Sequence, residues 1–322
     1  MREIIIDENN AGGRADKYLL KYLNLAPKNF IYKTLRKKNI TLNGRKAFGH
    51  EILRKGDALR FFISDAVLDS FISRKTAPKT RLKPDIVYED ENILVCNKPR
   101  GVLSQPSGVN GQRAMTDIAL SYLSGNGFDL NAPFTPAFVN RLDMNTSGIM
   151  TCGKTLASTR WLAAAIAEGK AEKRYIAVAR GNIKTDGVIN LPLTKSQYHR
   201  KAEISGENAK GFKNALTVYK PLEHAGGYTL VEISLKTGRF HQIRAHFSAI
   251  GHPIAGDVKY GFSPASGSPR DRVSHALHAV SAQYHEPEGI LGYIARKCFV
   301  ASPPPEFTRQ IKAMGFSTDK FA

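Results

Sequence analysis

Asn140-Arg141-Leu142-Asp143-Met144-Asn145-Thr146-Ser147-Gly148 is a stretch that lies between two strand-like runs, and it is too polar to belong to a core. It places one carboxylate, Asp143, two residues after a fixed cation, Arg141. A nearby positive charge favours the ionised form of a carboxylate. An ionised aspartate on a loop beside a sheet can act as a nucleophile or a base without a metal or a cofactor. The stretch predicts a catalytic Asp143, and the alternative is an aspartate that only caps a turn.

The sequence on both sides of this stretch alternates between strand-like and helix-like runs. Predicted strands are 86–88, 93–97, 149–152, 175–180, 214–221 and 228–235, and predicted helices are 115–123, 155–168 and 241–250. Paired strands with helices between them are typical of α+β proteins. We therefore predict an α+β fold for residues 85–322, with a mixed and largely antiparallel sheet.

The chain has 322 residues, 42% of them hydrophobic, and a formal net charge of +19. This length suits two domains, and the hydrophobic share can build a core for each. A positive charge of this size would attract a polyanion, and a nucleic acid is the commonest one. The alternatives are a basic surface that serves solubility and one that binds acidic membranes. The composition favours a nucleic acid as the partner.

Residues 1–75, which we call the N-terminal block, hold 16 Lys/Arg against 8 Asp/Glu. Their pattern predicts helices over 15–25 and 28–38 and strands over 40–42 and 57–63. Lys33, Arg36 and Lys37 would project from the outer face of the second helix. These three residues predict an RNA-binding face, and the alternative is an ordinary solvated helix surface.

The sequence becomes polar and carries two prolines over residues 66–84, which we interpret as a linker. We set the domains as an RNA-binding domain at 1–75, a linker at 76–84 and a catalytic domain at 85–322.

A phosphate-loop pattern, G-x-x-x-x-G-K-S/T, is matched by Gly148-Ile149-Met150-Thr151-Cys152-Gly153-Lys154-Thr155. A true phosphate loop follows a buried strand, whereas this segment follows polar residues and has a strand-like spacer. We predict that Lys154 is an ordinary lysine at a strand end. A phosphate-loop nucleotidase is the alternative.

The three cysteines, Cys96, Cys152 and Cys298, are far apart and form no CxxC pair. This argues against a disulfide framework and a cysteine zinc site. The chain start lacks the apolar region of a signal peptide, and no apolar run approaches the roughly 20 residues of a membrane helix. We expect a cytoplasmic protein with no membrane partner. We also expect no metal, because His241 and His246 are not spaced as ligands on one helical face.

Several long segments resemble one known family. They are Asn97-Lys98-Pro99-Arg100-Gly101, Asn140-Arg141-Leu142-Asp143 with Thr146-Ser147-Gly148, Glu172-Lys173-Arg174-Tyr175-Ile176-Ala177, Thr237-Gly238-Arg239-Phe240-His241-Gln242-Ile243-Arg244-Ala245-His246 with Gly251-His252-Pro253-Ile254, and Leu277-His278-Ala279. In this order they resemble the RluA family of RNA pseudouridine synthases. Many members have histidine where this chain has Asn140. The N-terminal block resembles an S4 domain, a small RNA-binding fold, at residues 13–16, 28–32, 35–37 and 53–57.

The resemblance implies an isomerase that converts uridine to pseudouridine in structured RNA and needs no cofactor. We expect the protein to be a monomer. The expected substrate is 23S ribosomal RNA of the large subunit, and transfer RNA is the alternative. A non-catalytic RNA-binding factor that keeps the fold is the rival function.

The resemblance also implies roles for five residues. Asp143 would be the catalytic aspartate, and Arg244 would pair with it. Arg141 would fill the gap left by a flipped base or grip a phosphate. Tyr175 would lie against the uracil ring, and Leu277 would form an apolar wall. Without the resemblance, Tyr175 and Leu277 could be ordinary core residues, and Arg244 could belong to a surface ion pair.

Overall fold

The computed structural model describes residues 1–73, 76–108, 112–196, 201–205, 211–261, 274–287 and 289–318. The N-terminal block forms a four-stranded antiparallel sheet in the order β1-β4-β2-β3. Its elements are β1 (Arg2–Ile5), α1 (Ala15–Tyr22), α2 (Lys28–Arg36), β2 (Ile40–Leu42), β3 (Arg45–Lys46), β4 (Ala58–Phe61) and α3 (Asp65–Ser70). The predicted domain boundary at residue 75 lies outside the described residues.

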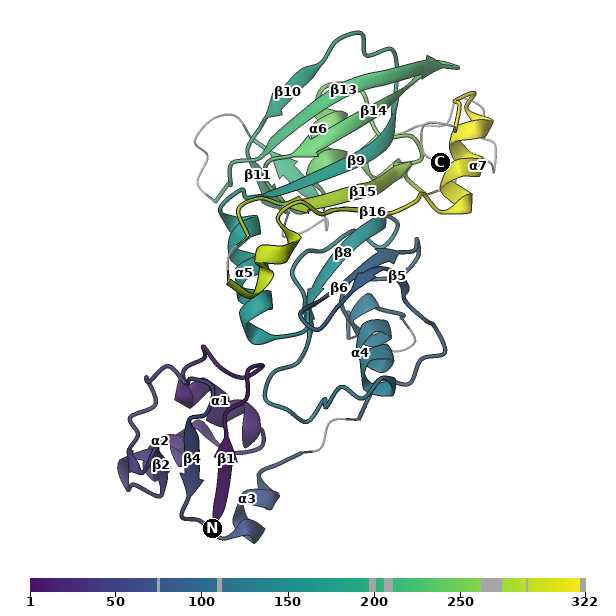
Figure 1. The fold of residues 1–322 in the computed structure, drawn as a ribbon. Helices are drawn as coiled ribbons and strands as arrows, with labels where there is room; N and C mark the ends of the chain where they lie inside the picture. The colour runs from purple at the N-terminus through teal and green to yellow at the C-terminus, as the bar shows by residue number, and fades with distance from the viewer. Residues whose placement is uncertain are drawn as a thin grey trace.

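Figure 1 shows the N-terminal block as a compact unit beside the large sheet. This block has a hydrophobic core of its own. Leu19 and Leu23 pack there with Ile31 and Leu35 of α2, and all four are almost fully buried. Each pair is four residues apart, so both members lie on one face of a helical turn. Both predicted helices are confirmed, although α1 ends at Tyr22 instead of residue 25.

The predicted linker over 66–84 is wrong at its start, because residues 65–70 form helix α3. Leu68 of this helix is fully buried in the core of the N-terminal block. Burial of a leucine side chain contributes roughly 2 kcal/mol, so one apolar anchor can hold a short helix within a polar stretch. Residues 76–84 that follow contain no helix or strand.

The rest of the described chain is built on a ten-stranded sheet with the central order β10-β13-β14-β9-β15-β8-β6-β5. Its strands are β5 (Asp85–Glu89), β6 (Ile93–Lys98), β7 (Ala137–Phe138), β8 (Ser147–Gly153), β9 (Ala171–Arg180), β10 (Gly187–Asn190), β13 (Leu216–Ala225), β14 (Tyr228–Leu235), β15 (Leu277–Tyr284) and β16 (Cys298–Val300). Strands β8 and β15 pair in parallel, and the other described pairs are antiparallel. This confirms the predicted α+β class with its mixed, largely antiparallel sheet.

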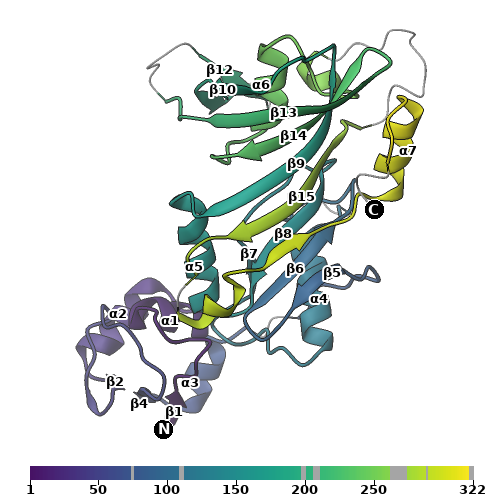
Figure 2. The ribbon, with the colours of Figure 1, turned by 45° about the horizontal axis from the view of Figure 1, so that its top comes forward.

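Helices cover both faces of this sheet. Successive residues of a strand point to opposite sides, so one strand can pack against helices on both faces. The helices are α4 (Met115–Gly125), α5 (Leu156–Ala167), α6 (Gln242–Ala249) and α7 (Pro305–Ala313). On β6, Leu94 and Cys96 join the core cluster that contains α4 and α6, whereas Ile93 and Val95 join the cluster that contains α5. Figure 2 shows the N-terminal block at one end of the sheet and the hairpin of β11 (Leu193–Lys195) and β12 (Ala202–Ile204) at the other.

The parallel contact between β8 and β15 depends on Gly148. This residue has φ +117°, and a Cβ atom there would overlap the backbone of Ala279. Only glycine permits so close an approach of two backbones. The contact brings the start of β15, with Leu277 and His278, beside the loop that precedes β8.

Candidate active site

Asp143 lies on the loop of residues 139–146, which joins β7 to β8 and is fixed by side-chain contacts to backbone. Asn140 accepts a hydrogen bond from the Thr151 N–H at 2.9 Å and donates one to the Ile149 carbonyl at 3.0 Å. Ser104 Oγ accepts from the Leu142 N–H at 2.8 Å. An asparagine side chain offers both a donor and an acceptor, so Asn140 holds the loop against β8 from two points.

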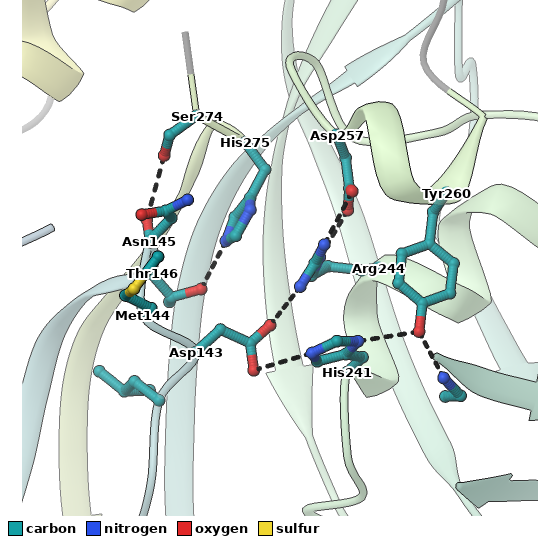
Figure 3. A network of polar contacts seen from close by, with 12 residues as sticks. Asp143, Met144, Asn145, Thr146, His241, Arg244, Asp257, Tyr260, Ser274 and His275 are labelled. Atoms are coloured by element: carbon teal, nitrogen blue, oxygen red, sulfur yellow. Dashed lines mark hydrogen bonds and ion pairs between the residues drawn. The ribbon is translucent and has the colours of Figure 1, made fainter. Parts of the chain in front are cut away.

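Arg244 of α6 holds the carboxylate of Asp143 (Figure 3). Its Nη1 donates to Asp143 Oδ2 at 2.8 Å. Its Nε and Nη2 donate to the two carboxylate oxygens of the buried Asp257, at 2.6 and 2.8 Å. Burial opposes the charge of Arg244, but hydrogen bonds and attraction from both aspartates raise its pKa above the ordinary value. The guanidinium is therefore a fixed cation whose orientation is set by Asp257.

The second oxygen of Asp143 faces a histidine. Asp143 Oδ1 lies 3.7 Å from His241 Nε2, and His241 Nδ1 lies 2.9 Å from the hydroxyl of Tyr260. Tyr260 also accepts a hydrogen bond from the Ala202 N–H at 2.5 Å. Burial lowers the pKa of His241 to about 4, against the attraction of Asp143. The imidazole is therefore neutral at neutral pH.

Asp143, His241 and Arg244 line one pocket that opens to solvent. The full set of its lining residues is Arg141, Leu142, Asp143, Thr146, Tyr175, Leu235, Arg239, His241, Gln242, Ile243, Arg244 and Leu277. Tyr175 and Leu277 are 7% and 4% exposed, so the pocket has an apolar, largely desolvated wall. Burial raises the pKa of the Tyr175 hydroxyl, which stays protonated.

The structure brings five predicted site residues, Arg141, Asp143, Tyr175, Arg244 and Leu277, to this pocket. The prediction that Arg141 is the cation beside the Asp143 carboxylate is wrong. Arg141 is exposed and, among the described residues, has no hydrogen bond or ion pair, whereas Arg244 contacts the carboxylate. Residues next to each other in a loop can point apart, so proximity in sequence did not identify the partner.

Sequence reasoning missed two members of the network and misread a third. Asp257 and Tyr260 lie just after the motif segment Gly251-His252-Pro253-Ile254 and were not predicted as site residues, and His241 was considered only as a metal ligand. The sequence contained one indication of Asp257, because the motif segment that ends at Ile254 continues directly into Ala255-Gly256-Asp257. The distance of 13 positions between Arg244 and Asp257 gave no indication that they pair.

The predicted RNA-binding residues Lys33, Arg36 and Lys37 are exposed on α2, away from the buried face of Ile31 and Leu35. They do not line the pocket of Asp143. The sequence-predicted site residues thus fall into two groups, one on the N-terminal block and one on the sheet.

The phosphate-loop alternative is wrong. Residues 147–153 form the buried strand β8, not a turn with free N–H groups. Lys154 Nζ donates to Glu89 Oε1 at 2.8 Å and to the Asp90 carbonyl at 2.5 Å. Lys154 is therefore a strand-end lysine in an ion pair, as predicted.

Every helix in the described ranges is too short or too polar to span a bilayer.

Comparison with known proteins defines the class of this chain. Residues 92–249 match the family model of RNA pseudouridylate synthases. The chain is 31% identical to ribosomal large subunit pseudouridine synthase D of Yersinia pestis, over 98% of this chain and 95% of that protein. It is 33% identical to ribosomal large subunit pseudouridine synthase C of Vibrio parahaemolyticus, over 88% of each. The human RNA pseudouridylate synthase domain containing 4 shares the fold, with a TM-score of 0.57 and 22% identity, over 71% of this chain and 92% of that chain.

The fold and these relatives define an RNA-modifying isomerase. The chain belongs to the RNA pseudouridylate synthase family, and it is an RNA pseudouridine synthase of the RluA type, as the motifs predicted.

Proposed function

We propose that this protein converts specific uridines of 23S ribosomal RNA of the large subunit to pseudouridine, with Asp143 as the catalytic residue and no cofactor. The observation that carries the proposal is the ion pair of Asp143 and Arg244 in a pocket whose apolar wall includes Tyr175. Relatives that match almost the whole chain are named as synthases of the large ribosomal subunit, and this supports the choice of RNA.

The reaction breaks the bond between N1 of uracil and C1′ of ribose, turns the base and joins its C5 to C1′. The C5 hydrogen leaves and N1 gains one, so the product is an isomer and no redox partner is required. An ionised carboxylate at the ribose is what the step needs, and it can serve either as a nucleophile or as a base. Arg244 binds Oδ2 of Asp143, and Oδ1 lies on the side of His241, another residue that lines the pocket.

The other pocket residues have roles that suit a flipped nucleotide. A base inside a helix must leave its stack, at a cost of a few kcal/mol. Tyr175 would lie against the uracil ring, and an aromatic contact of this kind contributes roughly 1–3 kcal/mol. Leu277 would exclude water, and the exposed Arg141 would fill the gap in the RNA or grip a phosphate.

We also propose that residues 1–75 are an S4-like RNA-binding domain, followed by a linker at 76–84 and the catalytic domain at 85–322. The separate core of the N-terminal block and the exposed Lys33, Arg36 and Lys37 support this division. The protein would act as a monomer in the cytoplasm.

Tritium release tests the proposed reaction, because the C5 hydrogen is lost to water. Unmodified large-subunit RNA with tritium at uridine C5 should release label with the wild-type protein. Asp143→Asn should lower the rate by roughly 10³-fold or more while RNA affinity is retained. Asp129→Asn, which changes an exposed aspartate outside the pocket, is the matched control and should act as the wild type does.

Two outcomes would contradict the proposal. Equal release by Asp143→Asn and wild type would remove Asp143 from the chemistry. Tight RNA binding by the wild type with no release from ribosomal or transfer RNA would favour the rival function of a non-catalytic RNA-binding factor.

A further inference from the structure

The two oxygens of the Asp143 carboxylate have different surroundings. Oδ2 accepts a hydrogen bond from Arg244 at 2.8 Å. Oδ1 lies 3.7 Å from His241 Nε2, which is beyond the length of an N–H···O hydrogen bond. Both residues line the pocket, and Figure 3 shows the carboxylate of Asp143 facing the ring of His241.

The hydrogen bonds of Tyr260 determine which nitrogen of His241 carries the proton. The hydroxyl oxygen of Tyr260 already accepts from the Ala202 N–H. Its own proton has one acceptor among the described residues, His241 Nδ1 at 2.9 Å. A buried hydroxyl without an acceptor would cost roughly 1–3 kcal/mol. Tyr260 therefore donates to Nδ1, and the proton of the neutral imidazole is on Nε2.

The opposite tautomer is unfavourable for a second reason. It would point the lone pair of Nε2 at the negative Oδ1 of Asp143, and the two would repel. In the assigned tautomer, Nε2–H is a donor and Oδ1 is an acceptor, and they face each other across the 3.7 Å gap. The ring is also held by stacking on Phe240, with ring centroids 3.8 Å apart.

The backbone at His241 has a conformation that residues other than glycine rarely adopt. His241 has φ +52° and ψ +26°, in the left-handed region. An L-residue pays roughly 1–2 kcal/mol there, and glycine would avoid the cost. A side chain kept at such a position is frequently part of a functional site.

A hydroxyl group fits this pair, because its oxygen can accept from Nε2–H while its proton goes to Oδ1. Within an RNA chain, the 3′ and 5′ oxygens of ribose are esterified, so the only free hydroxyl of the sugar is at 2′. We propose that His241 and Asp143 together bind the 2′-hydroxyl of the target nucleotide, and that Tyr260 positions His241 for this contact. The inference rests on the proposed function, since it places the ribose at Asp143. It makes His241 a residue by which the enzyme distinguishes RNA from DNA at the target position.

Binding of two product analogues tests this inference. The probes are synthetic stem-loops of the large-subunit RNA segment modified in the tritium assay, with pseudouridine or 2′-deoxypseudouridine at the target. Neither can turn over. The wild-type protein should bind the hydroxyl form roughly tenfold more tightly, the effect of one hydrogen-bonded group. His241→Ala should reduce this ratio to about twofold, and Tyr260→Phe should reduce it in the same direction.

His241→Gln should restore part of the ratio, because its amide N–H can still donate. The matched control is His285→Ala, which removes a half-exposed histidine that contacts Glu172 away from the pocket and should keep the wild-type ratio. A wild-type ratio in His241→Ala, or a ratio of one in the wild type, would overturn the inference. If His241→Ala does not fold, His241→Gln and Tyr260→Phe carry the same test.

The tritium assay on the uridine stem-loop separates this inference from the proposed function. Loss of turnover in the wild type with an intact binding ratio would contradict the function and leave the hydroxyl contact standing. Normal turnover with no dependence of binding on His241 would contradict the hydroxyl contact alone.

Discussion

At the scale of single residues, the loop that carries Asp143 depends on a buried cation. Lys98 is 0% exposed, and its ammonium group donates to three backbone carbonyls. These belong to Pro99 at 2.9 Å, Val102 at 2.7 Å and Met144 at 2.9 Å. Met144 follows Asp143 directly, so Lys98 joins the end of β6 to the loop that carries Asp143. Burial lowers the pKa of Lys98 to about 7, although Asp143 raises it.

This burial predicts an unusual pH dependence of stability. The folded pKa lies below the ordinary value of about 10.4, so the unfolded chain binds more protons between pH 7 and 10. The contribution of Lys98 to the free energy of unfolding therefore rises with pH across this window. Relative to that of Lys98→Met, the free energy of unfolding of the wild type should rise by about 2 kcal/mol between pH 7 and pH 9. Urea unfolding, followed by the fluorescence of Trp161, measures this difference.

The exposed Lys83 supplies the control for this experiment. Lys83→Met should show the same change with pH as the wild type. A constant difference between wild type and Lys98→Met from pH 7 to pH 9 would contradict the account of Lys98.

Site residues differ in how far the sequence could predict them. Asp143 was recognisable because it stands in a long motif with its own chemistry. The pairing of Arg244 with Asp257, and of His241 with Tyr260, was not recognisable, since it depends on the turn between α6 and residue 257. Side-chain direction at a turn is set by packing, which local sequence does not encode.

At the scale of elements, helix α2 has a basic outer face and an apolar inner face. Ile31 and Leu35 on the inner face are buried in the core. Lys33, Arg36 and Lys37 lie away from that face and are exposed to solvent. A rigid helix that presents three cations has the geometry to contact successive phosphates of an RNA backbone.

Charge reversal on α2 should weaken RNA binding and its salt dependence. The triple variant Lys33→Glu, Arg36→Glu and Lys37→Glu removes up to three phosphate contacts. The slope of log affinity against log salt should fall by about 2. Filter binding of unmodified large-subunit RNA at several salt concentrations measures both effects.

A triple reversal far from α2 controls for net charge. Lys184→Glu, Arg309→Glu and Lys312→Glu change three exposed residues of the sheet part of the chain. The control should keep most of the affinity and the slope. Equal losses in both triple variants would mean that overall charge, and not the face of α2, attracts the RNA.

The elements themselves were largely predictable from periodicity, but their pairing was not. The predicted runs at 149–152 and 228–235 became β8 and β14. Strand β15, which was not predicted, lies between β8 and β9 in the sheet and carries Leu277 to the pocket. Its place depends on Gly148, and a close backbone contact between segments 131 positions apart leaves no local pattern.

At the scale of the whole molecule, the buried His275 and His278 join distant parts of the chain, and the partly buried His241 makes a more local contact. His275 Nε2 lies 2.8 Å from the Thr146 hydroxyl, and His278 Nδ1 lies 2.9 Å from that of Ser147. His241 contacts Tyr260, as described above. Burial lowers the pKa of each of these three histidines to about 4.

These histidines predict that the protein loses stability in mild acid. Their folded pKa lies below the ordinary 6.5, so the unfolded chain binds more protons as the pH falls from 6.5 to 4. Stability from each group is full above pH 6.5 and is lost through this window. For each histidine, the free energy of unfolding should fall by on the order of 2 kcal/mol between pH 7 and pH 5. Urea unfolding at pH 7, 6 and 5 measures the loss.

The variant His278→Gln tests how much one of these histidines contributes to the pH dependence of stability. His278→Gln keeps a donor for the Ala301 carbonyl, which His278 Nε2 contacts at 3.0 Å. It should remove the uptake of one proton on unfolding, so the free energy of unfolding should fall less steeply as the pH is lowered. An unchanged slope would show that His278 is not among the groups that take up protons on unfolding.

The sequence by itself determined the class of the fold and the family and singled out Asp143, because periodicity and long motifs can be read from the local order of residues. The tertiary structure alone decided that Arg141 stays exposed and makes no ion pair with Asp143, that Tyr260 and Asp257 join the network and which residues line the pocket. The pocket depends on contacts between segments more than a hundred positions apart, such as Arg244 with Asp143, and only the packed sheet brings such segments together.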